Sequence, residues 1–103
     1  MARYEILDVA TAGLGEATIT ANTLFELGMM YSSGRSVPPD LVVAHKWFNL
    51  AAMKGNSDAV RLRREIAAEM TDAQIGQAQR AARDWLKQHP QQSHPAPQLR
   101  VAA

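Results

Sequence analysis

Two apolar stripes with the period of an α-helix, separated by a short turn, constrain the fold of this chain more than any other feature. The first stripe contains Leu24, Leu27, Gly28 and Tyr31, whose spacing places them on one face of a helix. The second helix has a wide apolar face made of Leu41, Val43, Ala44, Trp47, Phe48, Leu50, Ala51 and Ala52. Because one partner helix cannot cover a face of that width, the sequence predicts a helical hairpin that also packs against a later helix.

The first helix of this hairpin is predicted over residues 23–33. Thr23 and Glu26 have the spacing of a capping box, which marks a helix start. Gly34 follows the last periodic residue, so we expect it to end the helix in a left-handed conformation. Gly28 would normally weaken a helix by about 1 kcal/mol relative to alanine. Its place inside the apolar stripe therefore predicts that a neighbouring backbone comes close.

The second helix is predicted to begin after Asp40 and to end near Lys54. Two prolines precede Asp40, and its carboxylate can accept hydrogen bonds from free amide groups at the helix start. Gly55 is the expected C-terminal cap. His45 falls on the predicted polar side of this helix, so we expect a histidine that faces solvent.

Two further helices are predicted in residues 57–88. The third begins at Ser57 or Asp58 and runs to about Met70, with an apolar stripe that includes Leu62 and Ile66. The fourth begins at a second capping box, formed by the segment 71–74, and continues to about residue 88. Its periodic residues are Ile75, Ala78, Ala82 and Leu86.

The order of small and aromatic residues through the hairpin matches a repeat pattern. Its members are Leu27, Gly28, Tyr31, Gly34, Val37, Asp40, Ala44, Trp47, Ala51, Ala52, Gly55 and Ala59. This order resembles the Sel1-like repeat, a tetratricopeptide-related family of α-helical solenoids that bind other proteins. The resemblance covers one repeat of about 34 residues. It implies that the chain works by binding another protein or a protein complex.

The chain departs from the repeat pattern in two places. After Ala59 the expected start of another repeat is replaced by a charged run, so the array stops after one repeat. The segment from Met70 to Trp85 is similar to terminal helices in bacterial members of the family, which implies that it caps the solenoid. Ser36 stands where the family usually has glycine, which bears on how tight that turn can be.

These observations predict an all-α fold, a short α-solenoid or helical bundle of about four to five helices. We divide it into an N-terminal helix and connection (1–22), the repeat hairpin (23–56), two C-terminal capping helices (57–88) and a flexible proline-rich tail (89–103). The N-terminal segment also fits a strand, because Tyr4 to Leu7 could alternate between two faces.

Composition and charge exclude several classes of function. A net charge of +1 disfavours nucleic acid as the main ligand. No apolar run is long enough to span a membrane. Acidic Glu5 and Asp8 interrupt the apolar stretch that a signal peptide would need. The absence of cysteine excludes disulfides and cysteine-based zinc sites. It fits a reducing compartment, so we expect a cytoplasmic protein, although it would also fit many periplasmic proteins.

No motif for catalysis, cofactor binding or metal binding is present. The sequence contains no glycine-rich phosphate loop and no nucleophile elbow. His45, His89 and His94 lack the spacing of metal ligands. Asp40 is better explained as a helix cap than as a catalytic acid. We therefore predict no catalytic residue, no cofactor and no metal.

The predicted binding residues are apolar side chains left over from the core. Phe25, Met29 and Met30 extend the apolar arc of the first helix beyond what the second can cover, and Leu99 and Val101 lie in the tail. This surface predicts an adaptor or an accessory subunit of a larger complex. Alternatively, the N-terminal segment buries it. Two other hypotheses remain open: self-association as a homodimer, and a small cell-wall-related enzyme or binder.

Overall fold

The computed structural model describes residues 19–92 and shows an all-helical arrangement there, without strands. The helices are α2 (Ala21–Ser33), α3 (Leu41–Met53), α4 (Ser57–Ala67) and α5 (Asp72–Gln88), followed by the short 3-10 helix η1 (Pro90–Gln92). The predicted all-α class is therefore confirmed. The predicted N-terminal helix falls on residues 1–18 and so lies outside the described residues, as does the tail after residue 92.

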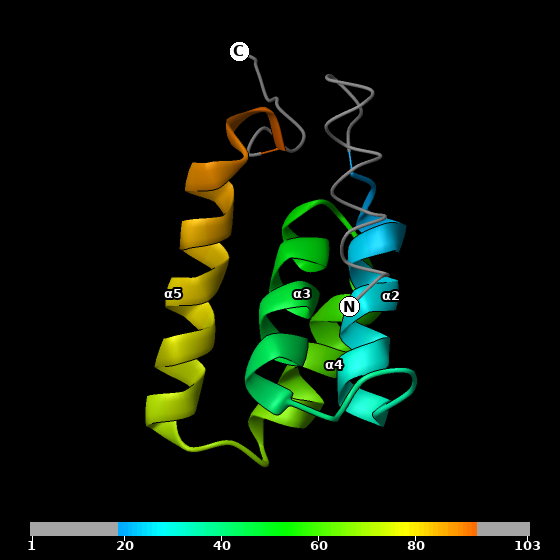
Figure 1. Ribbon diagram of the computed structural model, residues 1–103, viewed down its shortest axis with the longest axis vertical. Helices are drawn as coiled ribbons and strands as arrows, with labels where there is room; N and C mark the ends of the chain where they lie inside the picture. The colour runs from blue at the N-terminus through cyan, green and yellow to red at the C-terminus, as the bar shows by residue number, and fades with distance from the viewer. Residues whose placement is uncertain (1–18, 93–103) are drawn as a thin grey trace.

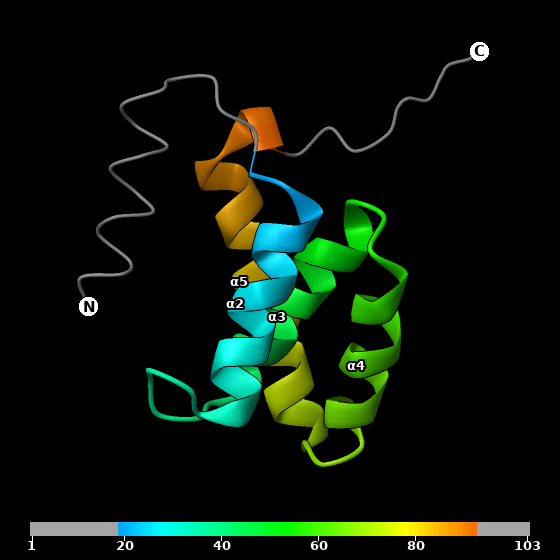
Figure 2. The ribbon, with the colours of Figure 1, turned by 90° about the vertical axis from the view of Figure 1, so that its right-hand side faces the viewer.

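Helix α3 lies at the centre of the arrangement. It is flanked by α2 and α5, and α4 covers a further side, as the two views at right angles show (Figures 1 and 2). Each of the three outer helices contacts α3. The central position of α3 explains why its apolar face is so wide, because three neighbours remove it from water.

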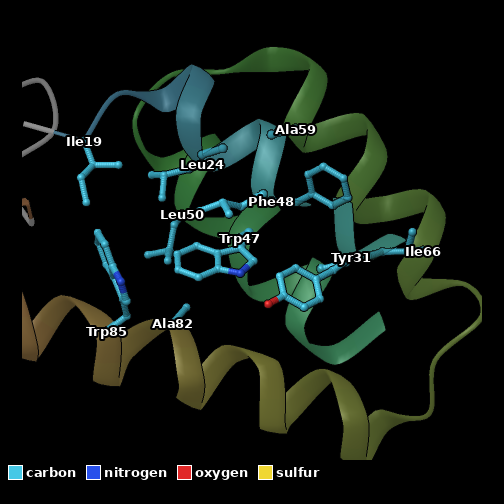
Figure 3. Close-up of a cluster of buried hydrophobic side chains, with 13 residues drawn as sticks. Ile19, Leu24, Tyr31, Trp47, Phe48, Leu50, Ala59, Ile66, Ala82 and Trp85 are labelled. Atoms are coloured by element: carbon cyan, nitrogen blue, oxygen red, sulfur yellow. The ribbon is translucent and has the colours of Figure 1, made fainter. Parts of the chain in front are cut away.

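The core of the hairpin is packed from both helices. Leu24, Phe48 and Leu50 are among its fully buried side chains (Figure 3). A Cβ atom added at Gly28 would lie 2.5 Å from Cδ1 of Phe48. The prediction of a close approach at Gly28 is thus correct, but its partner is wrong: an aromatic ring, rather than a backbone, occupies the space that a side chain would need.

The turn between α2 and α3 uses two left-handed residues. Gly34 has φ 78° and its N–H donates to the Met30 carbonyl, which confirms it as the C-terminal cap of α2. Ser36, where the family resemblance expects glycine, has φ 73°. The turn therefore keeps the conformation for which glycine is best suited. Asp40 caps α3 as predicted, since its side chain accepts from Val43 N at 3.2 Å.

Two predicted helix limits are wrong by a few residues. Thr20, not Thr23, is the N-cap of α2: its Oγ1 atom accepts from Thr23 N at 3.1 Å. Both threonines stand three residues before a polar side chain, and the helix takes the earlier one. Helix α4 ends at Ala67 rather than near Met70, because the chain must turn before α5 begins.

The second pair of helices is defined by its caps. Asn56 accepts from Ala59 N at 2.8 Å and starts α4. Thr71 and Gln74 form the predicted capping box at the start of α5. Both helices are strongly amphipathic, and the residues that they bury are few: Ala59 and Ile66 on α4, and Ala78, Ala82 and Trp85 on α5.

The two ends of the described chain are joined by one buried hydrogen bond. Ile19 N donates to Oε1 of Gln92 at 2.8 Å, and Gln92 is only 1% exposed. The approach to η1 is fixed by His89, whose ring stacks on Trp85 with centroids 4.3 Å apart. Residues 89–92, which the sequence assigns to a flexible tail, thus contribute to the packed structure.

Candidate protein-binding surface

The structure places the three predicted binding residues of α2 on two different flanks. Phe25, Met29 and Met30 are all half-buried and pack against the core. Phe25 and Met29 are four residues apart and share one flank, whereas Met30 is turned by about 100° from Met29. We call Phe25 and Met29 the α2 flank. The other two predicted binding residues, Leu99 and Val101, lie outside the described residues.

The α2 flank lies beside Phe48, whose ring packs against Gly28. The rings of Phe25 and Phe48 have centroids 5.7 Å apart and are inclined at 52°. Phe48 is fully buried, and Phe25 lies over it with part of its own ring exposed. A partner that covered Phe25 and Met29 would therefore extend an existing aromatic core instead of starting a separate one.

A second surface, which the sequence analysis missed, runs along α3. Met53 is 44% exposed and is the one exposed large hydrophobic residue in the part of the chain that the structure describes. Val42, Lys46, Asn49 and Met53 follow one another at helical spacing and so share one face. We call these four residues the outer strip of α3. The signal that could have revealed it is the lack of any aspartate or glutamate in the helix 41–53.

The cations at the outer strip have an unusual environment. The ammonium of Lys46 lies 4.3 Å from the ring centroid of Trp47, and burial lowers the pKa of Lys46. Arg63, from α4, donates from Nη1 to Oδ1 of Asn49 at 2.6 Å. The strip therefore combines apolar surface with positive charge that is partly removed from water.

His45 does not face solvent, and that prediction was wrong. It is 4% exposed, and its Nδ1 atom has no hydrogen-bond partner within residues 19–92. Burial lowers the pKa of His45, and the nearby Arg63 lowers this pKa further. His45 lies near Arg63 of α4, a neighbour that the wheel of a single helix cannot show.

Other charged groups have ordinary surface roles. Arg61, in the basic cluster of α4, pairs with Asp58 at 3.7 Å and with Glu65 at 3.3 Å, as expected for a solvated helix face. Among residues 19–92, no group of three or more histidine, cysteine, aspartate or glutamate side chains could hold a metal ion. No helix in this range has the length and apolar character needed to cross a membrane.

Comparison with known families gives one match. Residues 21–56, which comprise α2, the turn, α3 and the connection to α4, match the Sel1 repeat. The match covers about a third of the chain and confirms the resemblance drawn from its small and aromatic residues. Sel1 repeats generally mediate protein–protein interaction and are not catalytic. No curated protein and no solved structure matches this chain.

Proposed function

This chain contains a Sel1 repeat, and on that premise we propose that it is a non-enzymatic protein-interaction module, an adaptor or an accessory subunit of a larger protein complex. The observation that supports this role most directly is the α2 flank, where Phe25 and Met29 remain half-exposed beside a closely packed core. Methionine adapts its shape to a partner, and a half-exposed aromatic ring supplies a large contact area.

The chemistry of the described residues supports binding over catalysis. His45, a titratable group whose pKa is lowered by burial, has no nucleophile or carboxylate bonded to it among the hydrogen bonds of residues 19–92. Asp40 uses its carboxylate to cap α3. The absence of cysteine is the ground on which we extend the proposal to a cytoplasmic location.

The test is affinity capture of the full chain from its own cells, with mass spectrometry and a size measurement of the captured species. We expect a companion protein in stoichiometric amount with the wild type. Met29→Asp should lose it, because a carboxylate on the α2 flank opposes apolar contact. Gln79→Asp, at an exposed position of α5 away from the α2 flank, is the matched control and should retain it. Circular dichroism must show equal helix content in all three proteins.

Two results would count against this proposal. If Met29→Asp folds normally and keeps the companion, the α2 flank is not the binding surface. If only the chain itself returns, with a mass that depends on dilution, self-association replaces the adaptor role.

A further inference from the structure

The outer strip of α3 lies on a side that none of the neighbouring helices covers completely. Trp47 turns toward α5, where its ring meets Trp85 edge to face with centroids 5.9 Å apart. Asn49 meets Arg63 of α4. The ring of Phe48 lies against Gly28 of α2. Lys46 and Met53, seven residues apart, share the remaining face, which places the strip between α4 and α5.

No carboxylate of residues 19–92 pairs with the positive charge on this strip. Neither Lys46 nor Arg63 has a carboxylate within ion-pair distance among residues 19–92. Arg61, two residues before Arg63 on α4, pairs with two carboxylates of its own helix. Arg64, on the same helix, also lacks an ion pair within residues 19–92 but is exposed, whereas Lys46 and Arg63 are both partly buried. Partial burial without an ion pair therefore sets the two cations of the strip apart from Arg61 and Arg64.

The geometry of the two cations suits an acidic ligand. Arg63 uses Nη1 to bind Asn49, and a guanidinium has further N–H donors that can hold a carboxylate. The Lys46 ammonium is partly desolvated above the Trp47 ring. A carboxylate gains more from a partly desolvated cation than from one fully surrounded by water.

We propose that the outer strip of α3 binds an acidic segment of a partner protein, in which carboxylates meet Lys46 and Arg63 and an adjacent apolar side chain covers Met53 and Val42. This inference rests on the proposed binding function and names a second surface and the chemistry of its occupant. The acidic character of the segment follows from two partly buried cations that have no ion pair among residues 19–92, and its apolar character follows from the exposed methionine beside them.

The test uses a phage-displayed library of random peptides selected on the full chain, followed by anisotropy measurements with the selected peptides labelled. We expect sequences in which aspartate or glutamate stands beside an apolar residue. Lys46→Glu should weaken their binding at least about tenfold, through loss of one contact and a new repulsion. Met53→Gln should weaken it less. Arg61→Glu is the matched control, since Arg61 lies outside the strip, and should leave the affinity unchanged.

Several outcomes would overturn the inference. Selected peptides without acidic residues would do so, as would acidic peptides that bind Lys46→Glu and the wild type equally well. A DNA oligonucleotide or anionic vesicles could instead bind the wild type more tightly than the selected peptides do. If Lys46→Glu abolished that binding, the two cations would be a site for phosphate groups and not for carboxylates. If no peptide is selected, or if only Met29→Asp abolishes binding, the strip is not the docking surface, while capture of a companion in cells would still uphold the proposed function.

Discussion

The α2–α3 hairpin and the α4–α5 pair reach the same helical form by different means. The hairpin is held by close packing of large side chains, with the ring of Phe48 filling the space left by Gly28. On α4 and α5 the fully buried residues are the small side chains Ala59 and Ala78, and the ends of both helices are set by polar caps.

Helix α3 is the common packing partner of the other helices in both regions. Helices α2, α4 and α5 each pack on α3. The hairpin depends on shape complementarity at one contact, so a single added carbon disturbs it. The α4–α5 pair depends on local signals and on a few contacts with α3, so changes there should be smaller and more local.

The largest effect is expected from a matched pair of glycine substitutions, one in each region. Gly28→Ala should lower the free energy of unfolding by roughly 1–3 kcal/mol, because the new Cβ meets the Phe48 ring. Gly76→Ala on α5 should raise it by up to about 1 kcal/mol, since its Cβ meets only Nη1 of Arg80 at 3.5 Å and alanine favours a helix. Urea unfolding measures both free energies. If both substitutions changed the free energy of unfolding in the same direction, the proposed difference between the two regions would be wrong.

A moderate effect is expected at the capping box of α5. Thr71→Ala should lower the free energy of unfolding by about 1 kcal/mol, because Gln74 N loses its acceptor. Thr71→Ser keeps the hydroxyl oxygen and is the control. Hydrogen exchange should show faster opening at the start of α5 than in α2 and α3. Equal acceleration throughout the chain would mean that α5 does not open separately from the hairpin.

A smaller effect of opposite sign is expected in the turn of the hairpin. Ser36 has φ 73°, a region that costs an ordinary residue about 1–2 kcal/mol. Ser36→Gly removes this strain but adds freedom to the unfolded chain, so the net gain should be at most about 1 kcal/mol. Ser33→Gly, within α2, should instead be destabilising. Thermal unfolding distinguishes the Ser36→Gly and Ser33→Gly variants. A loss of stability in Ser36→Gly would contradict the claim that the backbone of Ser36 is strained.

At neutral pH the smallest change in the free energy of unfolding is expected from substitution of His45, because the effect of this residue on stability appears only on acidification. In the folded protein the pKa of His45 lies below the ordinary value of 6.5. As the pH falls, His45 therefore takes up its proton in the unfolded chain before it does so in the folded protein. The stabilising contribution of neutral His45 is complete above pH 6.5 and is lost as pH falls through the lowered pKa. His45→Gln should therefore lose less stability on acidification than the wild type. Parallel pH curves for the two proteins would exclude this coupling.

The sequence predicts the fold well where the signal is local. Gly34, Asp40 and the Thr71–Gln74 box were all identified from their immediate neighbours, and each acts as expected. The buried positions of Tyr31 and Trp47 also followed from helical spacing. These features depend on residues within a few turns of one another, so one sequence is enough to find them.

The errors come from contacts between distant parts of the chain. His45 was assigned to solvent from the pattern of α3 alone, but in the packed structure it is buried and lies near Arg63 of α4. Gly28 signalled a close approach without revealing that Phe48 makes it. The outer strip of α3 was missed for the same reason: Asn49 and Arg63 come together only after α4 has packed on α3. Binding by Phe25, Met29 and Met30 stays a prediction.

The hydrogen bond between Ile19 and Gln92 has a consequence for folding during synthesis. The hairpin can pack once α3 has left the ribosome, yet the amide of Ile19 must wait for Gln92, the last residue of η1. Until then this amide remains hydrated at the open end of α2. This hydrogen bond can form only when translation has passed the whole helical region. A ribosome stalled after α4 would therefore carry a compact hairpin with an unfinished end, which limited proteolysis of the nascent chain should detect.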